Sequence, residues 1–159
     1  MILAAGLGTR MQKEVEGLDL DETTDRLASQ GAKGMIPIGR PFLDHTLQAM
    51  LDAGVTDFCL IVGPGASLFR KYYAAVGDKL DNASISFAVQ EQPLGTAHAV
   101  LAGEDWAADE PFMVFNSDNF YPAAAVEALA ATEAPATLMF ERQALIAGSN
   151  IPAERIKRF

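Results

Sequence analysis

The chain has 159 residues and half of them are apolar, which is enough for one domain with a substantial core. Its 12 basic and 21 acidic side chains give a net charge of −9. This balance argues against nucleic acid or an anionic membrane as a partner, because both attract clustered Lys and Arg. Cys59 is the single cysteine, which excludes an intrachain disulfide and a cysteine-rich zinc site. No apolar run reaches the roughly 18 residues of a membrane-spanning helix, and we expect a cytoplasmic protein.

The first motif is a glycine-containing turn near the start of the chain. An apolar strand at residues 1–5 leads into the turn Gly6-Leu7-Gly8-Thr9-Arg10. Glycines let a backbone turn sharply and approach a ligand closely, and converging N–H groups with a guanidinium can bind an anion. Met11 stands where a dinucleotide fingerprint needs a third small residue, and the Gly-Lys-Ser/Thr of a P-loop is missing. We therefore predict a phosphate-holding loop of another kind, the alternative being an ordinary turn without a ligand.

The next segment, residues 12–31, is polar and acidic and shows no lasting periodicity. Such a pattern predicts a long loop, which is either a solvated insertion or a mobile lid over a site. Lys33 follows it and precedes a short apolar extended piece. Pro41 then opens a helix, and an apolar stripe at helical spacing continues until Gly54 ends it.

From there to the C-terminus, predicted strands and helices alternate. Strands are expected at residues 57–62, 85–89, 111–115 and 136–140, and helices at 67–76, 97–102 and 122–132. Alternation at this spacing is typical of a three-layer α/β domain with a mostly parallel sheet. Residues 155–159 resemble the start of an element, so we expect a domain that is incomplete at its C-terminus.

Polar clusters follow three of the predicted strands. Ligands of parallel sheets bind at the carboxyl ends of the strands. The glycine turn follows the first strand, Gln90 to Thr96 follow the third, and Asp118 ends the fourth. We therefore expect all three clusters to meet at one edge of the sheet.

Each cluster has a chemical interpretation and a simpler alternative. Asp118 is a hard oxygen ligand suited to Mg²⁺, or else the cap of a turn. Arg10 and Lys33 would neutralise phosphate charge, although for either one alone a solvated surface cation is the commoner case. The Gln90 amide offers a donor and an acceptor, which match the imide edge of uracil or thymine, unless it is only a polar strand end. His98 is interpreted as a packed rather than a catalytic residue.

These motifs resemble those of the sugar-1-phosphate nucleotidyltransferases. The similar segments are Leu-Ala-Ala-Gly-x-Gly-Thr-Arg-Met at 3–11, Lys33 before Met-Ile-Pro-Ile-Gly, Gln-x-x-x-x-Gly-Thr-Ala-His-Ala at 90–99, and a strand ending in Asp118. The resemblance implies a Rossmann-like three-layer α/β/α nucleotidyltransferase fold over residues 1–159. It also implies transfer of a nucleotidyl group from a nucleoside triphosphate, with UTP or dTTP favoured, to a sugar 1-phosphate. Mg²⁺ is the implied cofactor.

The resemblance also assigns roles to individual residues. Arg10 and Lys33 would act as catalytic residues on the phosphates, and Asp118 would bind the metal. The residues implied to bind the nucleotide are Leu3, Ala4, Ala5, Gly6, Gly8, Thr9, Gln90, Gly95, Thr96 and Ser117. The chain departs from the family pattern at Ala32, where Pro is usual, at Ser117, where Gly is usual, and in a longer spacing from Arg10 to Lys33. The family's sugar-binding half and a second metal-binding Asp are expected beyond residue 159.

Three other functions are compatible with parts of the pattern. The first is nucleotidyl transfer to another phosphorylated acceptor. The second is a non-catalytic module that binds a nucleotide or nucleotide sugar and regulates a partner. The third, an NAD-binding domain, is disfavoured by Met11.

Overall fold

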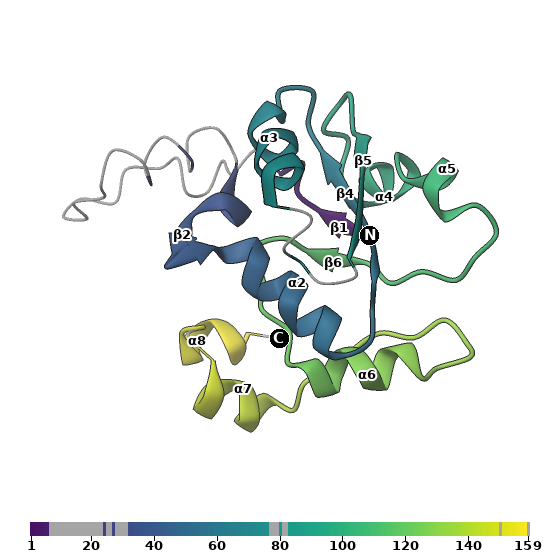
Figure 1. Ribbon diagram of the computed structural model, residues 1–159. Helices are drawn as coiled ribbons and strands as arrows, with labels where there is room; N and C mark the ends of the chain where they lie inside the picture. The colour runs from purple at the N-terminus through teal and green to yellow at the C-terminus, as the bar shows by residue number, and fades with distance from the viewer. Residues whose placement is uncertain are drawn as a thin grey trace.

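A parallel sheet of four strands forms the centre of the protein. The computed structural model describes residues 1–6, 24, 27, 32–76, 80, 83–149 and 151–158. Its strands are β1 (Ile2–Leu3), β4 (Asp57–Val62), β5 (Ser84–Val89) and β6 (Phe115–Asn116), in the order β5-β4-β1-β6 (Figure 1). Ile2 lies opposite Leu60 on one side and Phe115 on the other, and every pairing in this sheet is parallel. The predicted parallel sheet is therefore confirmed.

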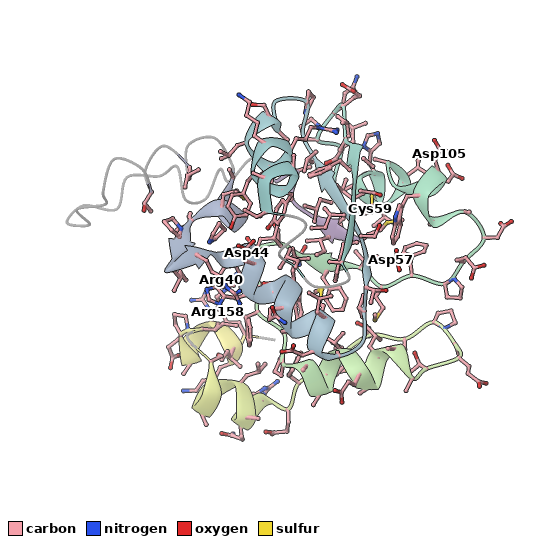
Figure 2. All side chains as sticks on the ribbon, viewed as in Figure 1. Arg40, Asp44, Asp57, Cys59, Asp105 and Arg158 are labelled. Carbon is pink, nitrogen blue, oxygen red and sulfur yellow. The ribbon has the colours of Figure 1, made fainter. Side chains whose placement is uncertain are left out.

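Strand β4 shows why this sheet is covered on both faces. Its residues from Phe58 to Val62 are all buried, as is typical of a central parallel strand between two layers of helices. Because side chains alternate along a strand, Leu60 and Val62 join a larger core, while Cys59 and Ile61 join a smaller core on the opposite face. Burial raises the pKa of the Cys59 thiol, which lies mid-strand and is not poised to react (Figure 2).

Helices form the two outer layers. The larger core receives α2 (Phe42–Asp52), α3 (Ser67–Val76) and α6 (Ala123–Ala130). The smaller core receives α4 (Thr96–Leu101) and α5 (Glu104–Ala107), which lie on the other side of the sheet (Figure 1). The three-layer α/β/α arrangement is confirmed. None of the described helices is long and apolar enough to cross a bilayer.

Short elements connect and extend these layers. A 3₁₀ turn, η1 (Lys33–Met35), precedes a small hairpin of β2 (Pro37–Ile38) and β3 (Arg40–Pro41), which turns at Gly39 with φ +74°. At the other end of the chain, α7 (Arg142–Gly148) and α8 (Ala153–Ile156) contact each other. The loop predicted at residues 12–31 lies outside the described residues except for positions 24 and 27.

Two strand predictions need correction. The strand expected at 111–115 is reduced to β6, because this edge pairs only with the two residues of β1. The strand expected at 136–140 does not form, and residues 135–140 have no regular secondary structure. A cleft of about 950 Å³ lies between this segment and residues 111–115, so the two backbones cannot join in a ladder.

Candidate nucleotide site

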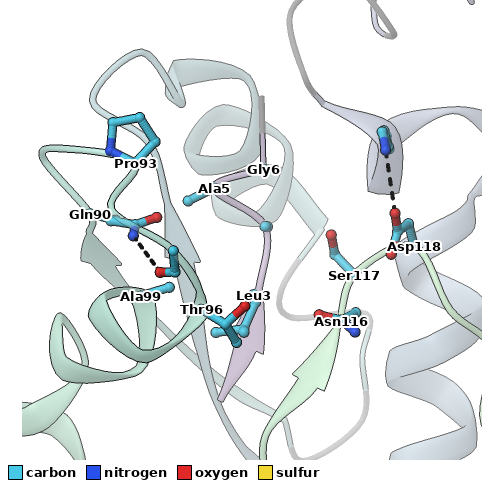
Figure 3. A pocket seen from close by; sticks show the side chains of 13 residues that line it. Leu3, Ala5, Gly6, Gln90, Pro93, Thr96, Ala99, Asn116, Ser117 and Asp118 are labelled. Carbon is cyan, nitrogen blue, oxygen red and sulfur yellow. Dashed lines mark hydrogen bonds and ion pairs between the residues drawn. The ribbon is translucent and has the colours of Figure 1, made fainter. Parts of the chain in front are cut away.

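A pocket of about 330 Å³ opens at the carboxyl end of the sheet (Figure 3). Strand β1 leads into it through residues 3–6, β6 through residues 116–118, and β5 through Gln90. Strands β4 and β5 lie on one side of β1, and β6 lies on its other side. The pocket therefore lies where the strand order reverses. This switch point is the usual ligand site of open α/β sheets.

Backbone hydrogen bonds hold the pocket walls in place. Beyond the ends of the strands, Ala4 N–H donates to Ile61 O at 2.7 Å and Ser117 N–H donates to Leu3 O at 3.1 Å. Gln90 N–H donates to Val62 O at 2.8 Å. The residues that line the pocket are therefore fixed by the same ladder that forms the sheet, which preorganises the site.

Gln90 forms one wall. It is 6 % exposed, and its Nε2 donates to the carbonyl oxygen of Gly95 at 3.1 Å. The same nitrogen lies 3.2 Å from Nδ1 of His98 on α4. Gly95 has φ +103°, a conformation that side-chain-bearing residues rarely adopt, which explains the glycine at the start of α4.

A pair of opposite charges forms the other wall. Lys33 Nζ lies 3.5 Å from Asp118 Oδ2 (Figure 3), and the side chains are 23 % and 46 % exposed. A partly exposed ion pair of this kind contributes at most about 1 kcal/mol, so a ligand can replace either partner. The pair depends on Gly34, because a Cβ there would lie 3.3 Å from Ser117 O and 3.3 Å from Leu43 Cβ. Glycine therefore allows η1 to pack closely against α2 and the loop that carries Asp118.

The donor set at Asp118 suits a particular class of metal. Among the described residues, no group of three or more His, Cys, Asp and Glu side chains gathers as a metal cluster. One carboxylate at an open pocket fits Mg²⁺, which keeps several waters and takes its other ligands from substrate phosphates. Ser117 and Asn116 add oxygen atoms beside Asp118 in the pocket lining.

A second polar network lies outside the pocket, between α2 and α3. The Tyr72 hydroxyl donates to Asp44 Oδ2 at 2.5 Å, and the Tyr73 hydroxyl donates to Asp44 Oδ1 at 2.8 Å. Burial, followed by the hydrogen bond to Asp44, raises the pKa of Tyr72 to about 12. Burial and the Asp44 charge raise the pKa of Tyr73 further. This network joins two helices and is structural.

The structure brings together every predicted site residue that it describes. The residues predicted from the sequence that line this one pocket are Leu3, Ala4, Ala5, Gly6, Lys33, Gln90, Gly95, Thr96, Ser117 and Asp118. The remaining three, Gly8, Thr9 and Arg10, lie outside the described residues.

Three further residues line the pocket and were missed: Pro93, Ala99 and Asn116. Asn116 had a signal in the sequence, because it is a polar residue at the same strand end as Asp118. Pro93 and Ala99 carry no polar side chain and could not be identified by chemistry. His98 was interpreted as a packed residue, and its contact with Gln90 depends on the path of the chain through Gly95 into α4.

The parallel sheet and its pocket at the strand switch point define a doubly wound α/β protein. The sequence profile of the nucleotidyl transferase family matches residues 1–144, and the chain belongs to this family. The resemblance inferred from the motifs is thereby confirmed.

Individual relatives agree with this assignment. A glucose-1-phosphate thymidylyltransferase of Streptomyces griseus is 31 % identical over 122 residues, which cover 76 % of this chain and 30 % of the relative. A UTP–glucose-1-phosphate uridylyltransferase of Haloferax volcanii is also 31 % identical, over 77 % of this chain and 44 % of the relative. The crystal structure of an apo UDP-glucose pyrophosphorylase has the same fold, with a TM-score of 0.62 and 20 % identity over 81 % of this chain and 52 % of that one. The chain thus spans about a third to a half of the length of these relatives.

Proposed function

We propose that the protein transfers a nucleotidyl group from UTP or dTTP to a sugar 1-phosphate, forming a nucleotide sugar and pyrophosphate. The observation that carries this proposal is the shared pocket, in which Gln90 lies on one wall and Lys33 and Asp118 lie on the other. An amide can hydrogen-bond a base, a cation can bind a triphosphate, and a carboxylate can hold the metal. The names of the thymidylyltransferase and uridylyltransferase relatives support the choice of donor and acceptor.

In the proposed reaction, an oxygen of the sugar phosphate attacks the α-phosphorus of the triphosphate. The bond between the α-phosphorus and the bridging oxygen breaks, and pyrophosphate leaves. Phosphoryl transfer of this kind depends on positioning and charge neutralisation rather than on a covalent enzyme intermediate. Gln90, Gly95 and Thr96 would hold the base, and the backbone of residues 3–6 would support the nucleoside. Gly8, Thr9 and Ser117 are proposed as further nucleotide contacts.

The charged residues would divide the work on the phosphates. Asp118 would hold Mg²⁺, which when bound offsets the negative charge of the phosphate oxygens. Lys33 would leave its ion pair with Asp118 and bind a phosphate oxygen, and we propose the same role for Arg10. The ion pair at 3.5 Å keeps both groups in place before the ligand arrives. Each charge then exchanges one partner for another, so neither is left uncompensated.

The test is the formation of nucleotide sugar from UTP and glucose 1-phosphate in the presence of Mg²⁺. Released pyrophosphate is the quantity measured. Asp118→Asn keeps the size of the side chain but removes its charge, and we expect it to lower turnover by at least about 100-fold, as loss of a key electrostatic group does elsewhere. Asp105→Asn is the matched control, because Asp105 is exposed on α5 and does not line the pocket. Near-normal turnover of Asp118→Asn would refute the metal role. Binding of UTP without turnover would instead favour a nucleotide-binding regulatory module.

A further inference from the structure

We propose that His98 is a positioning residue that locks the Gln90 amide with its oxygen toward the pocket, so that the site selects a nucleobase with a ring N–H. This inference rests on the proposed function, in which Gln90 meets the base. His98 does not line the pocket but contacts Gln90 from α4.

The first step is the orientation of the amide. A backbone carbonyl oxygen can only accept a hydrogen bond, so the Gln90 atom that lies 3.1 Å from Gly95 O must be the NH₂ group. This assignment follows from the chemistry of the partner and does not depend on distinguishing nitrogen from oxygen. Figure 3 shows the amide oxygen of Gln90 on the side that faces Ala5 across the pocket.

The second step concerns the histidine. The same NH₂ group lies 3.2 Å from His98 Nδ1, and two donors cannot face each other in a stable contact. In this contact His98 Nδ1 therefore acts as the acceptor, with the ring proton on Nε2. Gly95 O and His98 Nδ1 then accept the two amide hydrogens, one each.

Both amide hydrogens of Gln90 are thus donated to groups of the protein itself. With its NH₂ group occupied, Gln90 can present only Oε1, an acceptor, to a ligand in the pocket. Uracil and thymine carry an N–H at ring position 3 and match this acceptor. Cytosine at position 3 and adenine at position 1 present a lone pair, so two acceptors would face each other. Sites that read a base by a buried hydrogen bond discriminate strongly, because a mismatched group stays unpaired.

Gly95 O and His98 Nδ1 both disfavour a rotated amide, whose oxygen would then face two acceptors. Gln90 is 6 % exposed, and with Nδ1 removed only Gly95 O still opposes that rotation. The rotated amide, which offers NH₂ to cytosine, therefore becomes more populated. The loss of the Nδ1 acceptor should thus change which base binds more than how tightly the phosphates bind.

The experiment measures the dissociation constants of Mg²⁺·UTP and Mg²⁺·CTP by calorimetry on the intact protein. His98→Leu keeps bulk and removes the acceptor, and we expect the preference for UTP over CTP to fall about tenfold, the value of one hydrogen bond. His98→Asn places an amide oxygen near the position of Nδ1 and should retain the preference. His45→Asn is the control, because His45 is the other histidine of the chain and contacts Ile38 O, away from the pocket.

A second measurement does not depend on ligand binding. The tautomer of His98, read from long-range proton–nitrogen NMR spectra, should be the Nε2–H form in wild-type protein. An Nδ1–H tautomer would overturn the proposal. So would an unchanged base preference in His98→Leu, or an equal loss in His98→Asn and His98→Leu, which would indicate packing alone. If the wild-type protein binds no nucleoside triphosphate, the proposed function fails, and an Nδ1–H tautomer would still overturn the contact between His98 and Gln90.

Discussion

Among single residues, Lys33 has the closest link between position and chemistry. Among the described residues that line the pocket, Lys33 is the one with a basic side chain. The whole chain carries a net charge of −9. Under the proposed function, a triphosphate entering the pocket would meet Lys33, whose charge Asp118 offsets until the carboxylate takes another partner.

Lys33→Met should weaken the binding of Mg²⁺·UTP by about 10- to 100-fold, because a hydrogen bond to a charged group contributes about 1.5–3 kcal/mol. The dissociation constant is measured by calorimetry at low and high salt, and its salt dependence should be smaller in the variant. Lys157→Met is the control, since Lys157 pairs with Glu154 on α8 at 3.0 Å. Equal affinity in wild type and Lys33→Met would exclude the phosphate role.

The two tyrosines on Asp44 predict a dependence of stability on alkaline pH. The pKa of Tyr72 is raised to about 12 and that of Tyr73 is also raised, whereas an unfolded tyrosine titrates near pH 10. Below about pH 10 both states keep their protons and the contribution is fully present. Above it, the unfolded chain loses protons that the folded chain retains, so the free energy of unfolding falls as the pH rises.

Urea unfolding, followed by Trp106 fluorescence from about pH 8 to about pH 11.5, measures this effect. Tyr72→Phe removes one of the raised groups and should make the decline above pH 10 shallower. The same decline in wild type and variant would show that other groups cause it.

At the scale of elements, α2 connects the core to the pocket. It begins after Pro41, packs its apolar stripe under the sheet, and receives both tyrosine hydroxyls of α3 on Asp44. It also reaches the loop after β6, because Thr46 Oγ1 donates to Asn119 O at 3.3 Å. That loop carries Asp118, so a helix outside the pocket supports the proposed metal ligand.

Thr46→Val keeps the shape of this side chain, which is 1 % exposed, and removes the hydrogen bond. We expect a loss of about 1 kcal/mol in the free energy of unfolding and a several-fold weaker binding of Mg²⁺·UTP, because Asn119 O loses its partner. Thr46→Ser should restore both properties. The matched control is Thr132→Val. The hydroxyl of Thr132 donates to Leu129 O at 2.7 Å at the exposed end of α6. Unchanged binding in Thr46→Val would show that the loop does not depend on α2.

At the scale of the whole molecule, β4 contributes fully buried side chains to both cores. Leu60 belongs to the larger core and Ile61 to the smaller one, and both are 0 % exposed. Adjacent residues of one strand thus tie the two helical layers together, and we expect the layers to unfold together.

Leu60→Ala and Ile61→Ala should each lower the free energy of unfolding by about 2–5 kcal/mol, through lost burial and the cavity left behind. Far-ultraviolet circular dichroism and Trp106 fluorescence should give one coincident urea transition in each variant. Leu101→Ala is the control, because Leu101 is 60 % exposed and its loss should change stability by less than about 0.5 kcal/mol. Separate transitions would mean that the two cores are independent.

Much of this architecture follows from local sequence patterns. Residues 57–62 are a strand with the predicted bounds, and 67–76 is a helix with the predicted bounds, because an unbroken apolar run and a helical stripe leave few alternatives. The predictions at 111–115 and 136–140 were less successful, since strand formation requires a partner as well as apolar residues. A strand needs a neighbouring backbone within hydrogen-bonding distance, and no local pattern contains that information.

The sequence by itself determined the class of fold, the edge of the sheet that holds the polar residues, and the residue types at the pocket, because strand order along the chain and side-chain chemistry are written locally. Only the tertiary structure decided that Lys33 faces Asp118, that Thr46 supports the Asp118 loop, and that His98 contacts Gln90. The first two contacts join segments more than seventy residues apart, and the third depends on the left-handed turn at Gly95. Distances and directions of this kind arise only when the packed layers fix the backbone on both sides of the pocket.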